Sequence, residues 1–472
     1  MGDSFDSEFG TIDLGDERRD NRLRLVGNRL WESPDRSIKA ASCGLSEVIA
    51  AYRLFNNKHV TVSKILEPHR ESSLIRARKQ SRVLVVQDTT ELDFTKKTAL
   101  RGSGPLSVTK RRGFFAHTNF LIGDGRLPLG IWASDIYARL DEEHGKGEAR
   151  KSKTIEDKES HRWLAGYQHA CEVAEKLPDT EIVSISDREG DVYEVFAERQ
   201  KRLDAGQRAA DWLIRANQNR RLEGKDLGKK LFEKAEGGKR LGKVQFTISS
   251  KEQYKKKSGS NVKVQREGRE VEQEIRAAKV ELKAPWRKPG WKLPSLKVWV
   301  LSALEKNPPK GQDPVCWKLI TSLAIESLSD AKEVLEMYLD RWEIEVFHRV
   351  LKTGCRVEEI QLKDDAALKP CLALYEIIAW RILYFTHLGR VRPDLRCGAV
   401  FEDCEWRATV TVLSGKKAAK KEPTLGEFIK LIGQLGGHLG RKHDGMPGPQ
   451  AIWMGLRRIR DFALAYKALE GD

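Results

Sequence analysis

The stretch SDAKEVLEMYLDRWEIEVFHRVLKTG, Ser329 to Gly354, has the spacing of one long amphipathic helix. Ser329 or Asp330 can cap its start, Asp330 and Glu333 have capping-box spacing, and Gly354 supplies a stop. One face is apolar and consists of Leu335, Leu339, Trp342, Val346 and Val350. The adjoining face carries one carboxylate among cations and consists of Tyr338, Arg341, Glu345, Arg349 and Lys352.

The polar face has two interpretations. It can be a solvated helix surface on which Glu345 pairs with Arg341 and Arg349, each pair contributing about 0.2–0.5 kcal/mol. It can also be a functional surface that presents a carboxylate beside phosphate-binding cations. The helix alone does not separate these alternatives, so the rest of the chain has to decide.

Composition limits the class of protein. A chain of 472 residues with 40% apolar residues predicts two to four domains with proper cores. No run of about 18 apolar residues lacks a charge, and the acidic start GDSFDSEFG has no signal-peptide pattern. We therefore expect a cytoplasmic protein with no membrane partner.

The net charge and the cysteines indicate the kind of partner and the redox state to expect. The 85 Lys and Arg outnumber the 69 Asp and Glu, and the resulting net charge of +16 favours a polyanionic partner, nucleic acid first. The seven scattered cysteines show no C-x-x-C pair, which predicts reduced thiols and neither a disulfide framework nor a zinc site.

The N-terminal part is predicted to be helical. Amphipathic helices are expected over 14–31, with Leu23, Val26 and Leu30 inward, over 46–57, opened by Ser46, and over 61–81. Their many arginines favour a helical DNA-binding domain at residues 1–75. The alternative is a helical cap on the following domain.

Strands dominate the centre, which we assign to an α/β catalytic domain at 76–385. The run SRVLVVQD ends in Asp88, and TEIVSISD ends in Asp187 and passes into a helix. A hairpin turn is expected at 123–125, and later strands carry Arg215 and Trp317. A β-rich insertion, basic at Lys255 to Lys257, is expected at about 217–311.

The C-terminal part, 386–472, is predicted to be a helical dimerisation domain. A buried helix near 375–388 and a basic linker precede two amphipathic helices whose apolar residues could face a twin copy. Burial of both faces within the same chain is the alternative. These apolar residues are Leu425, Phe428, Ile429, Ile432, Leu435, Ile452, Leu456, Ile459 and Phe462.

Three carboxylates in this order suit metal chemistry. Open α/β sheets bind ligands beyond the carboxyl ends of their strands, where we expect Asp88 and Asp187, and Glu345 joins them from a helix. Carboxylate oxygens select Mg²⁺ or Mn²⁺, and two such ions would serve phosphoryl transfer. For a single Asp at a strand end, a turn or capping role is the alternative.

Taken together, the motifs VVQDTT, SISDREG and Y-x-x-R-x-x-x-E-x-x-x-x-x-x-K resemble the bacterial insertion-sequence transposases with a DDE triad and a YREK signature. The resemblance extends from LGDERR near the start to TLGEFIKLIGQLGG and IWMGL near the end. It implies an RNase H-like core interrupted by a β insertion. It also implies metal ligands at Asp88, Asp187 and Glu345, with two Mg²⁺ or Mn²⁺ ions.

The resemblance also implies DNA contacts. Tyr338, Arg341 and Lys352 would contact transposon-end phosphates, with further phosphate contacts at Arg215 and Arg349. Trp317 would stack on a flipped base, its alternative being a core residue. Glu189 is expected to support the site or touch substrate. The acidic first ten residues depart from the basic arm expected of a DNA-binding start.

The implied function is cut-and-paste DNA transposition by nicking, hairpin formation and resolution, and strand transfer. Its partners would be double-stranded transposon-end DNA and target DNA, bound by a homodimer in a bacterial cytoplasm, at the nucleoid when on DNA. The alternative is a catalytically silent DNA-binding inhibitor or repressor of the same family.

Overall fold

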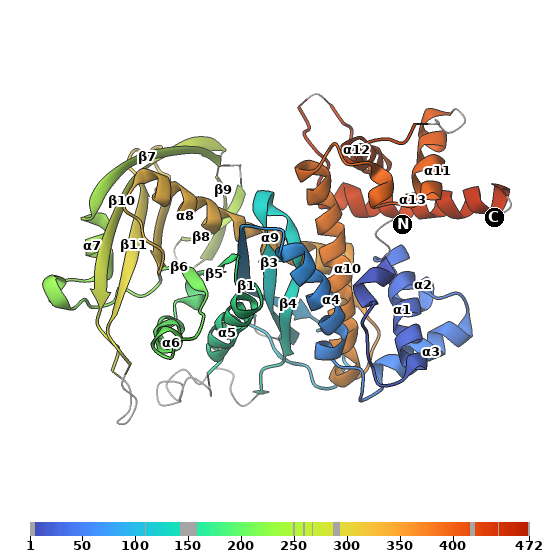
Figure 1. Ribbon diagram of the computed structural model, residues 1–472, viewed down its shortest axis with the longest axis horizontal. Helices are drawn as coiled ribbons and strands as arrows, with labels where there is room; N and C mark the ends of the chain where they lie inside the picture. Colours follow the sequence, from blue (N-terminus) through green and yellow to red (C-terminus); the bar gives the residue numbers. More distant parts are fainter. Residues whose placement is uncertain are drawn as a thin grey trace. The chain divides into compact units, whose positions relative to one another are not determined.

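The computed structural model (Figure 1) describes residues 5–108, 110–141, 158–248, 251–257, 260–266, 268–286, 293–415, 421–441 and 443–470, without the side chains of 251–266 and 470. Residues 142–157 of the expected charged segment, residues 416–420 of the basic linker and the side chains of Lys255 to Lys257 therefore lie outside the described residues. The fold divides into a first unit, Met1–Lys153, Lys176–Glu181 and Trp342–Asp472, and a second unit, Thr154–Glu175 and Ile182–Arg341.

The first unit begins with helices, as predicted. A 3-10 helix at Phe5–Phe9 is followed by α1 (Glu17–Glu32), α2 (Ile38–Ala41), α3 (Leu45–Phe55) and α4 (Val62–Ala77). The expected inward side chains of α1 are buried. The prediction that Ser46 opens α3 is wrong, because the helix begins at Leu45 after Gly44, whose φ of 101° suits a residue without a Cβ.

An antiparallel sheet forms the centre of the first unit. It comprises β1 (Arg82–Asp93), β2 (Gly104–Pro105), β3 (Arg112–Ile122) and β4 (Pro128–Tyr137), with β3 pairing to the other three. The β3–β4 turn confirms the hairpin predicted around Gly125. The expectation that β1 ends at Asp88 is wrong, because pairing with β3 continues from Thr89 to Asp93. Asp88 therefore lies within a strand.

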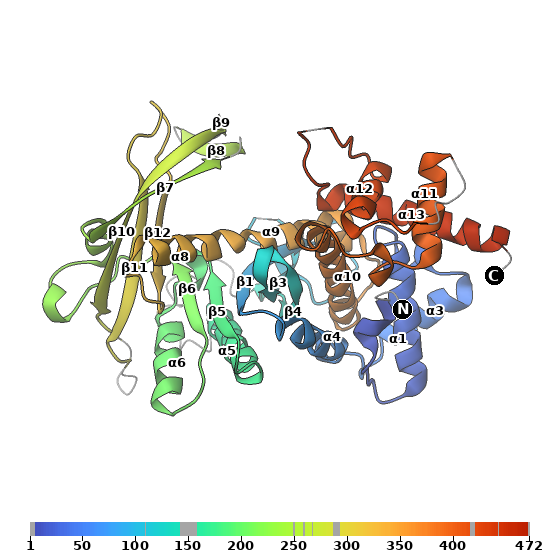
Figure 2. The same ribbon diagram turned by 45° about the horizontal axis from the view of Figure 1, so that its top comes forward.

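The second unit contains the other sheet strands, and Figure 2 shows α8 beside them. The strand order in this unit is β5-β6-β12-β11-β10-β7. Strands β5 and β6 pair in parallel, and the other neighbouring pairs are antiparallel. Strands β8 and β9 form a separate antiparallel hairpin. The predicted β-rich insertion is confirmed. The elements are α5 (His161–Lys176, its last residue in the first unit), β5 (Glu181–Ser186, its first residue in the first unit), α6 (Tyr193–Asp204), β6 (Asp211–Arg215), α7 (Leu231–Glu236), β7 (Lys239–Ile248), β8 (Lys251–Lys257), β9 (Ser260–Arg266), β10 (Arg269–Leu282), β11 (Leu296–Glu305), β12 (Cys316–Thr321) and α8 (Leu328–Asp340).

The single helix expected from Ser329 to Gly354 is interrupted. It consists of α8, α9 (Trp342–Arg349) and a π-helical turn at Val350–Gly354. Ser327 caps α8 and forms the capping box with Asp330, one turn earlier than expected. The predicted apolar stripe is also misplaced: Trp342 is 48% exposed, whereas Tyr338, expected on the polar face, is 6% exposed.

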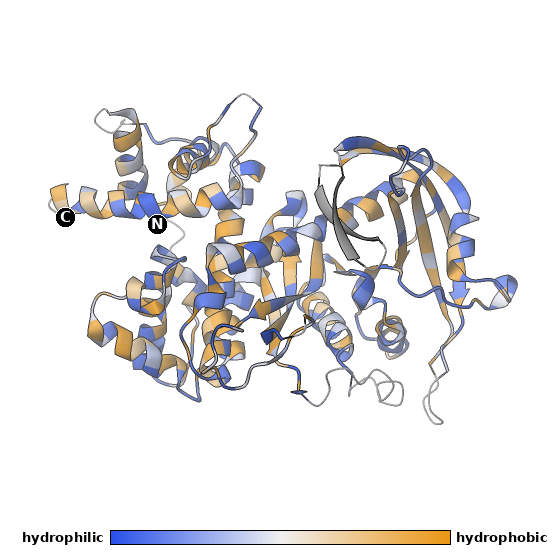
Figure 3. Cartoon of the chain, turned by 180° about the vertical axis from the view of Figure 1, so that it is seen from behind, coloured by the Kyte–Doolittle hydropathy of each residue, from blue (hydrophilic) through white to orange (hydrophobic). Residues whose placement is uncertain are grey.

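Four helices complete the first unit, α10 (Asp365–Val391), α11 (Asp403–Ser414), α12 (Leu425–Leu435) and α13 (Pro449–Glu470). Sequence reasoning missed α11, whose TVTV run has a β-type composition. Figure 3 shows polar and apolar residues mixed along these helices. None of the described helices is long and apolar enough to cross a membrane, and all seven cysteines are free thiols.

The apolar faces of α12 and α13 pack within their own chain. Leu456 and Ile459 are at most 3% exposed in one cluster with Phe385, Phe401 and Trp406. At the crossing of the two helices, a Cβ on Gly455 would overlap the carbonyl of Ile432, so only glycine permits this approach. The expectation that these apolar faces pack against a twin copy is therefore wrong. The burial considered as an alternative is what the structure has.

Glu8 anchors the N-terminal 3-10 helix in the core. It is 1% exposed and accepts from His69 Nδ1 at 2.7 Å and from Arg76 Nη1 at 2.6 Å, with Arg381 Nη1 at 3.9 Å. The N–H of Ile131 donates to His69 Nε2 at 3.0 Å, so the neutral ring carries its proton on Nδ1. Burial alone would raise the pKa of Glu8, but Arg76 and His69 outweigh it and lower the pKa to about 2. This part of the acidic start is thus an internal anchor.

Replacing Glu8 by Gln should lower the free energy of unfolding at pH 7 by about 3–5 kcal/mol, because half-buried Arg76 and buried Arg381 lose their carboxylate. The stabilisation should be complete above pH 4.5 and decline as pH falls toward 2. Urea unfolding at several pH values measures both effects. Asp6→Asn, on the same 3-10 helix but exposed, should change stability by less than about 0.5 kcal/mol. Equal losses for the two variants would contradict this role of Glu8.

Candidate active site

Two predicted carboxylates belong to the first unit. Asp88 lies on β1, where Thr89 N–H donates to its Oδ1 at 2.8 Å. Glu345 lies on α9, which packs against β1. The ring of Phe347 from α9 stacks on Phe120 at 4.8 Å, and Phe120 pairs across strands with Val86, on the same face of β1 as Asp88. The helix that carries Glu345 therefore covers the face of the sheet that carries Asp88.

The cations predicted beside Glu345 follow it closely. Arg349 is exposed at the end of α9, and Lys352, in the π-helical turn, donates from Nζ to the carbonyl of Glu91 on β1 at 3.5 Å. Between them His348 is buried, and burial, followed by the charge of Lys352, lowers its pKa to about 3. The imidazole is therefore neutral at physiological pH.

Asp187 belongs to the second unit and directly follows β5, as predicted. Its side chain accepts from the backbone N–H of Glu189 at 2.8 Å and caps a short 3-10 turn. The capping role considered as an alternative is thus present. It uses Oδ1, and the neighbouring Glu189 is exposed.

Tyr338 is the centre of a polar cluster in the second unit. Burial raises the pKa of its phenol, while the charges of Arg341 and Arg215 and a hydrogen bond from Arg215 lower it, and the charge of Asp187 raises it. The Arg341 guanidinium lies 5.7 Å from the centre of the Tyr338 ring. Arg215 also donates to the carbonyl of Cys316 at 3.4 Å. Three other predicted site residues, Arg341, Arg215 and Asp187, therefore act on Tyr338.

Trp317 borders this cluster. The centre of its ring lies 6.4 Å from the centre of the Tyr338 ring. The Trp317 ring also stacks on the ring of Phe246 of β7, with 5.3 Å between the two centres. Trp317 is half-buried and lines a cavity of about 470 Å³ in the second unit. Aliphatic side chains of α8 form part of the other wall, namely Leu335 and Leu339. Trp317 is thus a cavity wall and not a fully enclosed core residue.

No group of three or more His, Cys, Asp or Glu side chains among the described residues is arranged to hold a metal ion. The three predicted ligands are distributed over the two units, with Asp88 and Glu345 in the first. Both of these carboxylates are half-buried on packed elements. Half-buried oxygen donors suit a hard divalent cation.

Comparison with protein families gives three matches in chain order. Residues 1–60 match the model described as transposase DNA-binding, 196–374 the transposase DDE domain, and 377–468 the transposase Tn5 dimerisation domain. The chain is a DDE transposase. Its helical DNA-binding region, central mixed sheet with helices and helical dimerisation region are consistent with an RNase H-like α/β core.

The matches also locate the predicted residues. Glu345 and all six predicted DNA-contacting residues lie within 196–374, whereas Asp88 and Asp187 precede it. A DDE domain implies a divalent metal cofactor, and the other two matches imply a DNA partner and dimer formation. These findings confirm the predicted transposase family.

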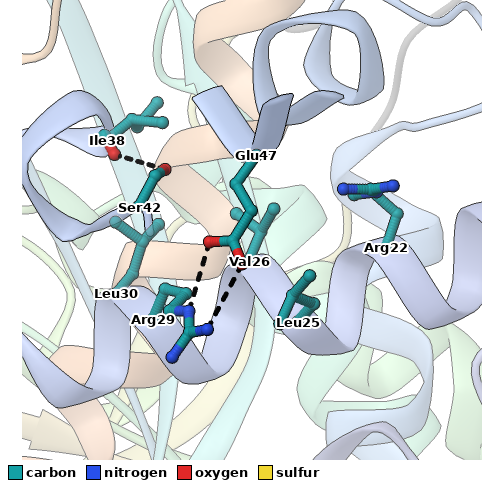
Figure 4. Close-up of a pocket in the computed structure, with 8 residues that line it drawn as sticks. All are labelled: Arg22, Leu25, Val26, Arg29, Leu30, Ile38, Ser42 and Glu47. Atoms are coloured by element: carbon teal, nitrogen blue, oxygen red, sulfur yellow. Dashed lines mark hydrogen bonds and ion pairs between the residues drawn. The ribbon is translucent and has the colours of Figure 1, made fainter. Parts of the chain in front are cut away.

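In the DNA-binding region an ion pair, shown in Figure 4, links α1 to α3. Arg29 of α1 donates to both oxygens of Glu47 of α3 at 3.2 Å, and the N–H of Cys43 adds a third contact. The hydrogen bond from Arg29 is the main cause that lowers the pKa of Glu47. The only carboxylate of α3 is therefore engaged within the protein.

Sequence reasoning assigned no role to two buried carboxyl groups close to α9 and the sheet, although it expected the helix that carries Glu376 to be buried. Glu343 of α9 contacts His387 Nε2 of α10 at 3.0 Å, and both side chains are less than 10% exposed. Glu376 of α10 is 1% exposed and accepts from Ser134 Oγ of β4 at 2.8 Å. The signal was a lone acid within the apolar run CLALYEIIAWRILYF. It predicts burial but does not identify the partner.

Burial is the main cause that raises the pKa of Glu376 from 4.5 to about 8, so the folded protein holds this proton at neutral pH. The unfolded chain releases it above pH 4.5, and stability is therefore lost as pH rises from 4.5 through 8.

Glu376→Gln should remove this dependence and raise the free energy of unfolding at pH 8 on the order of 3 kcal/mol, with little change at pH 4.5. Urea unfolding between pH 4.5 and 8 tests this. The exposed Glu17→Gln serves as the control. Parallel curves for wild type and Glu376→Gln would show that Glu376 ionises normally.

Proposed function

We propose that this transposase performs cut-and-paste transposition with Asp88, Asp187 and Glu345 as the ligands of two Mg²⁺ or Mn²⁺ ions. The observation that carries the proposal is that α9, with Glu345, covers the sheet face of Asp88. The DDE family match and the strand-end position of Asp187 support the third ligand. Bound divalent ions would stabilise the charge that develops on the attacking and leaving oxygens.

The chain's own residues would bind and orient the DNA. We propose that Tyr338, Arg341, Arg349 and Lys352, the YREK-type residues with their neighbour, contact transposon-end phosphates together with Arg215. Exposure of Arg349 and the net charge of +16 support phosphate binding. In the DNA-binding region, exposed cations lie on α3 and in the segments before and after it, and Arg29 already engages the carboxylate of α3. These cations are Arg36, Lys39, Arg53 and Lys58.

The reaction proposed has four steps. In the first nick, water breaks a phosphodiester bond and frees a 3′-hydroxyl. This hydroxyl attacks a phosphodiester of the opposite strand, which forms the hairpin bond while the old bond breaks and the flanking strand leaves with its own 3′-hydroxyl. The hairpin is then reopened, and the 3′-end is joined to target DNA. The cavity beside Trp317 would receive a base flipped from the hairpin, with the indole as its stacking platform.

Two proteins and two transposon ends would form the active complex. The dimerisation match spans residues 377–468, which include α11, α12 and all of α13 except its last two residues, Leu469 and Glu470. Since the faces of α12 and α13 expected to pair are buried, we assign self-association to exposed apolar residues of α13. Leu464 and Leu469 are 67% and 87% exposed.

Asp88→Asn, Asp187→Asn and Glu345→Gln should each reduce cleavage of transposon-end DNA in Mg²⁺ by at least about 10²-fold, the order lost with one electrostatic contact to a transition state. Specific DNA binding should remain, because these carboxylates would serve the cation. Cleavage and gel-shift assays measure the two properties. Glu359→Gln, an exposed acid of the first unit, is the matched control. Near-normal cleavage by one of the three variants would exclude that residue as a ligand.

Trp317→Ala should slow hairpin formation about 5- to 150-fold, the loss of about 1–3 kcal/mol of stacking, and leave the first nick little changed. An abasic site or mismatch at the flipped position should partly restore the rate, since unpairing then costs less. Single-turnover kinetics separate the steps. Trp286→Ala removes an 83% exposed indole of the same unit and is the control. Equal slowing of both steps without rescue would make Trp317 purely structural.

A further inference from the structure

A row of polar residues crosses the sheet of the first unit. Asp88 on β1 lies directly opposite Thr118 on β3, which lies opposite Ser134 on β4. Directly opposed residues point to one face with Cβ atoms about 4.5–5.5 Å apart. The neighbouring row on one side is apolar, formed by Val86, Phe120 and Ile131. On the other side of the polar row, Thr90 of β1 lies opposite Ala116 of β3. Apart from Thr90, the other paired residues of this face are apolar, so the polar row is a local feature of it.

Glu376 from α10 meets this row at the end opposite Asp88. Ser134 Oγ donates to its Oε1 at 2.8 Å. The Thr118 hydroxyl is near enough to lower the pKa of the carboxyl, although burial dominates and raises it. Among the described residues, neither Glu376 Oε2 nor Thr118 Oγ1 has another hydrogen-bond partner, and both residues are at most 1% exposed.

A protonated Glu376 would give hydrogen-bond partners to both Glu376 Oε2 and Thr118 Oγ1. A neutral carboxyl group has one O–H donor, and a threonine hydroxyl can accept it. The proton on Oε2 would satisfy the carboxyl and Thr118 together, while Oε1 accepts from Ser134. An ionised carboxylate could not donate, and its charge would repel the Asp88 carboxylate. An apolar side chain would leave two buried hydroxyl groups without this partner.

We propose that Glu376 is a positioning residue for Asp88, acting as a neutral acid that holds Thr118 and Ser134 and so fixes the strand row from which Asp88 binds a divalent cation. The proposal rests on the metal role of Asp88 proposed above. Glu376 touches neither metal nor DNA in this arrangement. It acts through the threonine beside Asp88, as residues behind a metal ligand commonly do.

The test is direct Mn²⁺ binding to the full-length protein, measured by calorimetry and by electron paramagnetic resonance, together with the thermal midpoint. Glu376→Met should weaken Mn²⁺ binding about 10-fold or more, the usual effect of losing an outer-shell partner. Its midpoint at pH 7.5 should change little, because removing the cost of keeping this buried acid protonated offsets the loss of a partner for the two hydroxyl groups. Glu376→Gln should stay within about two-fold of wild type, since its amide both donates and accepts.

A second test variant and a control variant complete the Mn²⁺-binding experiment. Thr118→Val removes the inferred acceptor and should weaken Mn²⁺ binding as Glu376→Met does, which provides the test if the Met variant does not fold. Thr386→Val is the control, because this buried hydroxyl of α10 donates to the Ile382 carbonyl of its own helix. Wild-type Mn²⁺ affinity in folded Glu376→Met, or in folded Thr118→Val, would overturn the positioning role.

Asp88→Asn separates the two proposals. If it binds Mn²⁺ as wild type does, the assignment of Asp88 as a ligand fails. If it loses binding while Glu376→Met retains it, only the positioning role of Glu376 fails.

Discussion

The packing of α9 on the sheet of the first unit is the contact on which the candidate site depends. Phe347 stacks on Phe120, and Ile344 and Val350 are completely buried on the same short segment. These side chains fix the helix on the face that holds Asp88. Glu345 is thereby presented from a rigid element and not from a loop, as a metal ligand requires. The aromatic pair thus links the core of the protein to its proposed chemistry.

Charged groups in the core are paired or neutral, whereas cations at the proposed DNA surface are exposed. Within the core, Glu8 is held by Arg76 and His69, and Glu343 by His387. Glu376 instead keeps its proton, because burial outweighs its two hydroxyl neighbours. Cations such as Arg349 remain exposed, so positive charge stays available to phosphate while internal charges are neutralised locally.

Local patterns predicted much of this structure. The strand before Asp187 follows from its β-rich apolar run, and the hairpin at Gly125 follows from turn chemistry. Helical spacing predicts the inward face of α1. The continuation of β1 beyond Asp88 was not predictable, because the segment TTELD is polar and acquires its strand form by pairing with distant β3.

The sequence did not predict which side chains contact one another in the folded protein. Helical spacing placed Tyr338 on the polar face, but its ring is buried and Arg215, from a distant strand, hydrogen-bonds to the phenol. The apolar stripes of α12 and α13 likewise predicted burial without saying against what. The candidate ligands could be named from motifs and family resemblance. The contacts that hold them, such as Thr118 beside Asp88, required the tertiary structure.

The most direct measurement of the central claim is rescue by a thiophilic metal. Asp88→Cys and Glu345→Cys replace a carboxylate by a softer ligand at the same position. If both side chains hold the catalytic cation, each variant will be inactive on transposon-end DNA in Mg²⁺ and will regain cleavage in Mn²⁺ or Cd²⁺. Folded, DNA-binding variants that remain inactive in all three metals, or that cleave normally in Mg²⁺, would contradict the claim.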